Sequence, residues 1–390
     1  MSKTKLYSST MLGAPVLNGV AGSMVALLDA VLVSGFGTTT VVSITVASGV
    51  ATVAFSAGHS FIANSVGLFA GATPTTLNGL KRIVSVATNS VTFSAAGIAD
   101  GTATGTLTTK VAPAGWLKSF SGTNLASYKM NDLEGTGFSL RVDDTGTTAC
   151  RVRAYETMTD VSTGTGPFPT LAQHASVPGM FWSKSNAANA DARAWYILAD
   201  SRGFYLFVNN YGASSAFQSY YFGDVLSLKS NDPYACVLRA NAGDSSNSSN
   251  MITDDLAYAD GSLQFGGMYV ARAANTLGGS VQAFSCPTLT VGLPLVHTIG
   301  GQGWAYPSAV DNGLILGSLV LVSPGTGYRG YFPGLRTSPQ YVGVSFSTGE
   351  YVVGTGVAAG KRVMVIKFGS TTPGGSQGVL FMDPISDWRV

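Results

Sequence analysis

Apolar and polar residues alternate along the chain from Thr38 onward, and this period of two is the strongest constraint on the fold. Val42, Ile44 and Val46 alternate before an ASG turn, and a second apolar series follows it. Successive side chains on a strand point to opposite faces, so the pattern is typical of half-buried β-strands. Similar runs in VGLFAGA, LKRIVSVATNSVTFSA and GTATGTLTTKVA give six or seven short strands. We therefore expect a small β-sandwich or barrel over residues 38–112, followed by the linker APAGW.

Residues 113–390 continue the pattern of strands and turns. In ARAWYILADSRGFYLFVNN, two almost continuously apolar segments flank DSRG, which is typical of a hairpin with a four-residue loop. Continuously apolar strands indicate burial on both faces. We predict a mainly β protein with a larger β-rich domain over residues 113–390 and a sub-boundary near the polar tract 240–250.

The surface of this protein must be poor in charge. Of 390 residues 45% are hydrophobic, which is sufficient for real cores, and 11% are charged, whereas soluble domains usually contain about 25% charged residues. The chain has 3 Glu and 10 Lys, so Ser, Thr, Asn and Gly build most of its surface. Such a surface loses little on desolvation when it packs against another subunit. We expect a symmetric homo-oligomer, a trimer or higher.

The net charge of +2, without a basic stripe, argues against nucleic acid and against a membrane surface as partner. The three cysteines, Cys150, Cys236 and Cys286, have no CxxC spacing, so they suggest neither a disulfide framework nor a zinc site. This cysteine usage fits assembly in a reducing cytoplasm. The N-terminal segment has no continuous apolar core before a cleavage site, so we expect no signal peptide.

Residues 18–37, NGVAGSMVALLDAVLVSGFG, carry the one convincing helical pattern. We predict a helix over residues 24–33, with Ser23 as the N-cap and Gly35 as the left-handed residue that ends it. A membrane span needs about 20 apolar residues, so this run is too short. Its apolar side chains occupy most of the circumference, so the helix either covers the end of its own domain or docks into another protein. We predict a docking segment over residues 1–37. Its contact residues are Met24, Leu27, Leu28, Asp29, Val31 and Leu32.

Two glycine-rich motifs match catalytic motifs by spacing. GTGYRG at 325–330 has the dinucleotide spacing, but YFPGLRTSP follows and cannot start the helix that would hold a pyrophosphate. GGSQG at 374–378 has the spacing of a nucleophile elbow, but no His lies after residue 297. We expect neither a dinucleotide cofactor nor a serine hydrolase.

The titratable residues are scattered along the sequence. His59, His174 and His297 are too isolated to indicate a metal site. The doublets Asp143-Asp144 and Asp254-Asp255 cannot form a glycosidase pair alone, because adjacent residues on a strand point to opposite faces. We therefore predict no catalytic residues, no cofactor and no metal, and a protein that is not an enzyme.

Aromatic residues gather among turn residues in SYYFGD, QGWAYP and GYRGYFPG. Rings carried on turns can stack on a carbohydrate or anchor a protein interface. Both alternatives stay open, with a host surface glycan or protein, or a neighbouring subunit, as the partner. The candidate contact residues are Tyr220, Tyr221, Trp304 and Tyr331.

Residues 10–110 resemble segments of tailed-bacteriophage virion structural proteins. In the module of that family, a His-x-Phe pair precedes a G-x-V-x-L/I-x-G strand, an NG turn and a strand leading to FTF. The matching positions here are His59, Phe61, Val66, Gly71, Asn78, Gly79, Val91 and Phe93. One departure is Asn64-Ser65, which replaces the glycine often found before the strand. The segment GAPVLNGVAGSMVALLDAVLVSGFG is similar to the opening of a group of phage structural proteins. Independently of the family, Asn78-Gly79 between two alternating runs predicts a type I′ hairpin.

The resemblance implies a small Ig-like β-sandwich over residues 38–112. It also implies a structural component of a tailed-phage virion, associated with the tail tip, baseplate or fibre, which assembles with other virion proteins through its N-terminal segment. Its location would be the virion, assembled in the host bacterial cytoplasm. The alternative functions are a host-receptor adhesin and a capsid decoration protein.

Overall fold

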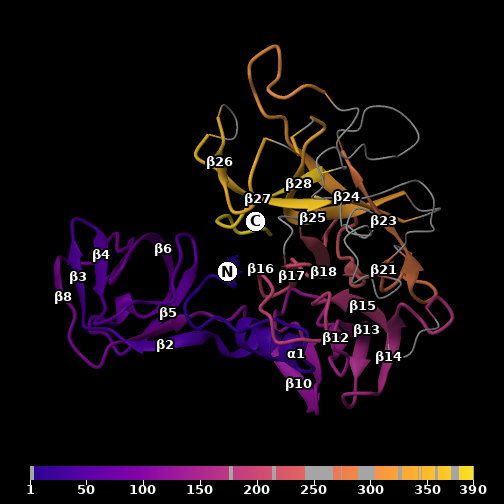
Figure 1. Ribbon diagram of the computed structural model, residues 1–390, viewed down its shortest axis with the longest axis horizontal. Coiled ribbons are helices and arrows are strands. Elements are labelled where there is room, and N and C mark those ends of the chain that lie inside the picture. The colour runs from indigo at the N-terminus through magenta and orange to yellow at the C-terminus, as the bar shows by residue number, and fades with distance from the viewer. Residues whose placement is uncertain are drawn as a thin grey trace.

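The regular structure of the described residues is almost entirely antiparallel β-sheet, with one short helix near the N-terminus (Figure 1). The mainly β class expected from the sequence is confirmed. The computed structural model describes residues 4–174, 179–212, 217–241, 267–273, 275–288, 304–323, 327–340, 342–343, 345–355, 359–369 and 377–389.

Three sheets build a larger body from residues on both sides of a small inserted module. The central sheet has the order β1 (Lys5–Ser8), β16 (Trp195–Ala199), β17 (Gly203–Val208), β18 (Gln218–Asp224), β20 (Cys236–Arg239), β21 (Met268–Val270) and β22 (Val281–Gln282). The first outer sheet has the order β10 (Leu117–Gly122), β11 (Leu125–Lys129), β12 (Ser139–Asp143), β13 (Ala149–Met158) and β14 (Gly164–Phe168), and β15 (Met180–Ser183) pairs with β13. The second outer sheet has the order β23 (Phe284–Pro287), β24 (Gly317–Ser323), β25 (Gly327–Thr337), β28 (Gln377–Met382), β27 (Arg362–Gly369) and β26 (Tyr351–Val353), and β19 (Leu226–Ser227) pairs with β25.

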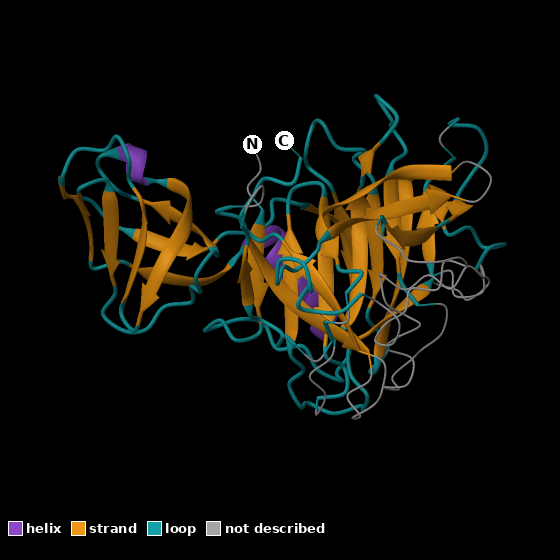
Figure 2. Ribbon diagram, turned by 90° about the horizontal axis from the view of Figure 1, so that it is seen from above, coloured by secondary structure: helices purple, strands orange, loops and turns teal. Residues whose placement is uncertain are grey.

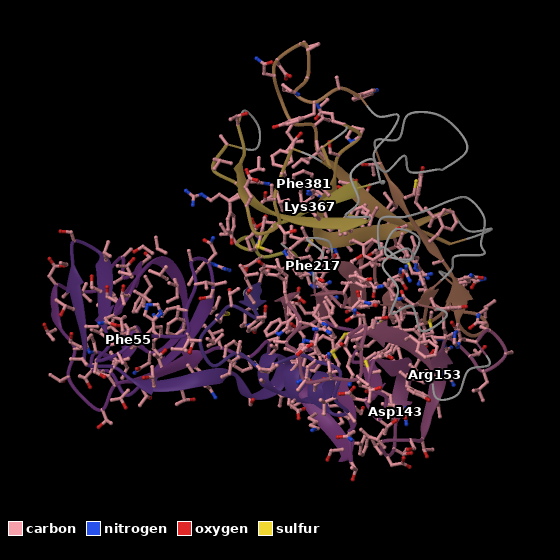
Figure 3. All side chains as sticks on the ribbon, in the orientation of Figure 1. Phe55, Asp143, Arg153, Phe217, Lys367 and Phe381 are labelled. Atoms are coloured by element: carbon pink, nitrogen blue, oxygen red, sulfur yellow. The ribbon has the colours of Figure 1, made fainter. Side chains whose placement is uncertain are left out.

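The central sheet is buried on both faces, as the continuous apolar pattern predicted. Leu206 and Tyr220 belong to a core shared with the first outer sheet, whereas their neighbours Phe207 and Tyr221 belong to a core shared with the second. Side chains fill both spaces, and Phe217 lies close to Lys367 of β27 (Figure 3). In the β16–β17 hairpin, the four residues 200–203 predicted as the loop lie between the paired residues Ala199 and Phe204, and the last of them, Gly203, already belongs to β17.

Residues 36–112 form a separate module (Figure 2). Its strands follow one hydrogen-bonded path. The order is β2 (Phe36–Thr40), β9 (Thr108–Val111), β5 (Val66–Ala70), β6 (Gly79–Ala87), β7 (Ser90–Ser94), β4 (Val50–Ala54), β3 (Ser43–Ala47) and β8 (Gly101–Thr102). The Phe69 and Phe93 rings meet in its core with centroids 5.0 Å apart. Ser48 and Gly49 both have positive φ, as a two-residue hairpin turn requires.

The predicted hairpin turn at Asn78-Gly79 is wrong. Eight residues, 71–78, separate β5 from β6, and they include a single 3₁₀ turn at Thr75–Leu77. The Asn78 side chain instead closes the base of this loop, because it accepts from the Ala72 N–H and donates to the Ala72 carbonyl, both at 2.9 Å. Asn78 acts here through its side-chain amide, which accepts one hydrogen bond and donates another, and not through a turn conformation.

The helix occupies residues 23–34. Ser23–Leu28 (α1) are α-helical, and Asp29–Ser34 continue as a π-helix that ends at Gly35 with a φ of 74°. Gly22, and not the predicted Ser23, is the N-cap residue, and it supplies no side-chain hydrogen bond. The free N–H groups of the first turn therefore need an acceptor from elsewhere in the chain.

Asp144 is that acceptor. Its Oδ2 accepts from the N–H groups of Met24 at 2.7 Å and Val25 at 3.2 Å, and its Oδ1 contacts the Lys184 ammonium directly. The Asp144 and Lys184 side chains are both 0% exposed. A carboxylate at the positive end of the helix and a buried cation thus stabilise each other.

The helix lies inside its own chain, which corrects the prediction that it docks into another protein. Asp29 finds both partners within the chain, at 2.8 Å from Lys118 Nζ and 2.8 Å from the Tyr128 hydroxyl. The apolar side chains among the predicted docking residues are all 0% exposed in the core: Met24, Leu27, Leu28, Val31 and Leu32. The apolar circumference is covered because strands of the larger body, and not one sandwich end, surround it. Residues 1–37 are therefore no separate segment, since β1 and the helix belong to the larger body.

An arginine joins the inserted module to the larger body. Arg82 on β6 donates to the carbonyls of Asn64 at 3.0 Å, Pro384 at 2.9 Å and Thr4 at 2.9 Å. Asn64 belongs to the module, whereas Thr4 and Pro384 lie near the two ends of the described larger body. One guanidinium thus fixes three chain segments at the junction.

The polar tract 240–250 lies almost entirely outside the described residues. The strands on either side of it, β20 and β21, pair with each other in the central sheet. These flanking strands therefore belong to one unit.

Candidate functional site

Two adjoining pockets lie at the end of the larger body where connections from its sheets meet. We call the larger one, with a volume of about 630 Å³, the loop pocket and the smaller one, of about 470 Å³, the terminal pocket. Glu134, Arg202 and Arg389 line both. Their walls come from four segments at strand ends: residues 131–136, 200–202, 224–235 and 387–389.

Ion pairs form the floor between the pockets. Arg389 Nε lies 2.6 Å from Asp200 Oδ2, and Arg202 Nε lies 3.2 Å from Asp224 Oδ2. Thr136 donates to both oxygens of Asp224, from its hydroxyl at 2.7 Å and from its N–H at 3.0 Å. These bonds join the hairpin loop of the central sheet to a loop of the first outer sheet and to residues near the end of the chain.

The carboxylates of the floor are already occupied. Asp200 also accepts from the N–H groups of Arg202 at 2.8 Å and Gly203 at 2.7 Å. Burial raises the pKa of Asp224, although Arg389 and the Thr136 hydrogen bonds act in the opposite direction. A general acid or base needs an oxygen that can reach a substrate. The carboxylates of the floor therefore hold the pocket's shape and charge in place, and they are not positioned to transfer a proton to or from a substrate.

The rim contains more accessible groups. Burial would raise the pKa of Asp132, but hydrogen bonds from the Ser201 hydroxyl and the Glu134 N–H outweigh it and lower this pKa below 3.8. The Glu134 side chain is 87% exposed, and its carboxylate lies 3.9 Å from Arg202. A ligand can therefore reach the Glu134 carboxylate.

These residues did not stand out in the sequence. Their common signal is a charged group at or after the end of an apolar strand, in DSRG, YYFGD and SDWR, within a chain that is 11% charged. That signal does not show which charged residues form ion pairs, because Asp200 and Arg389 are far apart in sequence.

Two of the four candidate aromatic contacts are wrong as surface sites. Tyr220 and Tyr221 are 0% exposed because both faces of β18 are covered. The Tyr220 ring stacks on Trp182 with centroids 5.6 Å apart, and the Tyr221 ring meets Phe332 edge-on at 5.3 Å. Both tyrosines are core residues.

The other two candidates are more accessible, but neither of them lines the two pockets. Trp304 is 47% exposed, and its backbone N–H donates to the Pro339 carbonyl at 3.0 Å. Tyr331 is half-buried on β25, opposite Leu226 of β19. The structure does not bring the four aromatic candidates together.

The carboxylate doublet at 143–144 has a structural role. Asp144 is the helix acceptor described above, and Asp143 accepts from the Thr145 hydroxyl at 2.7 Å. The second doublet, Asp254-Asp255, lies outside the described residues.

His59 holds a loop of the inserted module. Its Nδ1 accepts from the Phe61 N–H at 3.2 Å, and its Nε2 lies 2.8 Å from the Ala87 carbonyl. His174 is buried, and His297 lies outside the described residues. Gly327 and Gly330 of the first glycine motif lie in β25 and Gly378 of the second in β28, so the described part of each motif is strand.

Among the described residues, no three His, Cys, Asp or Glu side chains come together as a metal site. The helix of the described chain does not have the length and apolar character of a membrane span. The sequence matches no family model and no curated protein.

The buried phenols predict a loss of stability at alkaline pH. Burial raises the pKa of Tyr7, Tyr128, Tyr205 and Tyr221 above the ordinary 10.0. A folded-state pKa above the unfolded one gives a contribution that is complete below about pH 10 and is lost as the pH rises. We expect tyrosinate absorbance to appear in two steps, the later one together with loss of β circular dichroism. A denatured sample is the control, and one reversible step with native dichroism throughout would contradict the prediction.

Proposed function

We propose that this chain is a non-enzymatic structural component of a tailed-phage virion, associated with the tail tip, baseplate or fibre. The observation that carries the proposal is the role of the motif residues within residues 10–110. His59, Phe61 and Phe93, which match the family pattern, belong to one self-contained module, where His59 and Phe61 are linked by a hydrogen bond. Because these motif residues stabilise the module itself, they support a structural role for this protein.

The Ig-like character of this module is part of the same proposal. Its antiparallel strands and enclosed aromatic core support the assignment. Strand β6 pairs with β5 through residues 79–82 and with β7 from Ile83 onward, so it joins a group of β2, β9 and β5 to a group of β7, β4, β3 and β8. An immunoglobulin domain likewise divides its strands between two sheets.

Assembly through the N-terminal segment is proposed at residues that precede the helix. Leu12, Val16 and Val20 are 62%, 56% and 46% exposed. The neighbouring Leu17 is 0% exposed and bridges to Arg193, so the segment is fixed on the larger body while these side chains face outward. Fixed apolar side chains suit a contact with another virion protein or with a second copy in a symmetric homo-oligomer.

Mass spectrometry of purified particles from the bacterium that carries the gene tests the location. The chain should be present in stoichiometric amount, and its absence would contradict the proposal. In particles that contain it, Leu12→Asp/Val16→Asp should prevent incorporation without loss of folding. The matched control is Val42→Asp/Val84→Asp on the inserted module, where both side chains are 63% exposed. Equal incorporation of both variants would exclude the N-terminal contact.

A host-receptor adhesin is the second candidate, and the accessible Trp304 favours it. Trp304→Ala should then give complete particles that no longer adsorb to cells. Capsid decoration is the third, and a map of the particle would distinguish it by the position of the chain.

A further inference from the structure

We propose that the loop pocket binds a neutral, hydroxyl-rich ligand, namely a short saccharide. The inference goes beyond the proposed function and does not depend on it. Its volume of about 630 Å³ falls within the range of small-molecule sites.

The charge balance of the loop pocket favours a neutral ligand. Three carboxylates and three cations line it: Glu134, Asp224, Asp232, Arg202, Lys229 and Arg389. The adjoining terminal pocket adds Asp132, Asp200 and Asp387 without a further cation. Acidic saccharides and phosphates would meet this excess of negative charge.

The wall of the loop pocket is held rigid by its own ion pairs. Arg329 Nε lies 2.7 Å from Asp232 Oδ2, and the Ser227 hydroxyl donates to the same carboxylate at 2.8 Å. Arg329 is 2% exposed at its side chain and belongs to β25, so the second outer sheet anchors the 227–233 loop. A preorganised wall lowers the entropic cost of binding.

Three exposed polar groups remain for a ligand. Glu134, Ser230 and Asn231 line the loop pocket and are exposed. Within the described part of the chain, no hydrogen bond engages the Ser230 hydroxyl or the Asn231 amide. A carboxylate, a hydroxyl and an amide together offer both donors and acceptors, which matches sugar hydroxyls because each of these is donor and acceptor at once.

Apolar groups stand at the rim. Leu133 is fully exposed beside Glu134, and Leu228 is 55% exposed between lining residues of the loop pocket. Such side chains can cover the C–H faces of a sugar ring, while the polar groups bind its hydroxyls. This mixed rim distinguishes the site from a purely ionic one.

Saturation-transfer NMR of the purified full chain with maltose, lactose and di-N-acetylchitobiose tests the inference, followed by titration of any sugar that binds. We expect at least one of them to bind. Glu134→Ala should weaken it about tenfold or more, since a hydrogen bond to a charged group is lost, and Asn231→Ala should weaken it as well. Glu350→Ala is the matched control, because Glu350 is an exposed glutamate that does not line either pocket.

Unchanged circular dichroism and tryptophan fluorescence will show that each variant is folded. The inference fails if none of the three sugars binds, if Glu134→Ala and Glu350→Ala bind equally well, or if 3′-sialyllactose binds more tightly than lactose. Particles that contain the chain while no sugar binds would remove this inference and leave the proposed function standing. Sugar binding by a chain absent from particles would do the reverse.

Discussion

Replacement of Lys184 by Met is expected to destabilise the larger body by about 3–5 kcal/mol, because it leaves the Asp144 carboxylate buried without its cation. Lys184 and Asp144 are 0% exposed, and Lys184 also donates to the Val20 carbonyl at 2.8 Å. Denaturant unfolding followed by tryptophan fluorescence measures the loss. The five tryptophans, at 116, 182, 195, 304 and 388, all lie outside the inserted module, so the signal reports the larger body.

Lys118→Ala is the matched control. It breaks the ion pair with Asp29, whose partners are 27% and 34% exposed, so we expect a loss of about 1 kcal/mol or less. The double variant Asp144→Asn/Lys184→Met should recover part of the stability, since no charge then stays buried alone. An equal effect of Lys184→Met and Lys118→Ala would contradict a buried, coupled pair.

Leu28→Ala is expected to cost about 2–5 kcal/mol in the same assay, because its side chain is fully buried and leaves a cavity. Leu12→Ala, at a side chain 62% exposed, should change the unfolding free energy by less than about 0.5 kcal/mol.

Deletion of residues 1–35 should prevent the larger body from folding. The truncated chain should then show the fluorescence spectrum of solvent-exposed tryptophan. Native fluorescence in the truncated chain would show that the helix is not needed for folding, and would favour the docking role instead.

Local sequence patterns predicted where the strands lie, but they did not predict which strands pair with each other. The alternation after Thr38 and the DSRG loop depend on neighbouring residues, and the structure contains both the strands and the loop. The pairing of β1 with β16 depends on residues far apart in sequence, so no local period reveals it. The insertion of the module into the larger body was missed for the same reason.

The site residues show where local patterns mislead. SYYFGD ends in residues typical of a turn, yet Gly223 lies within β18. A side chain on Gly223 would come within 2.2 Å of the Gly203 Cα on β17, so this glycine allows close strand approach and not a turn. Asp144 lies in the connection between β12 and β13, but its contact with the helix N–H groups is 120 residues away in sequence. Burial and long-range pairing, which decide both roles, are properties of the folded chain.

The insertion of the module determines the order in which parts of the chain can fold during synthesis. The strands of the module pair among residues 36–111, so this unit can close as soon as the ribosome has released it. Residues 5–8 and the helix must wait for β16, Asp144 and Lys184, which are made much later. During that delay the nascent chain carries an apolar helix without its cover, and contacts of such large sequence separation form slowly. The segment made before the module is thus secured after it, and a chaperone has a long opportunity to bind there.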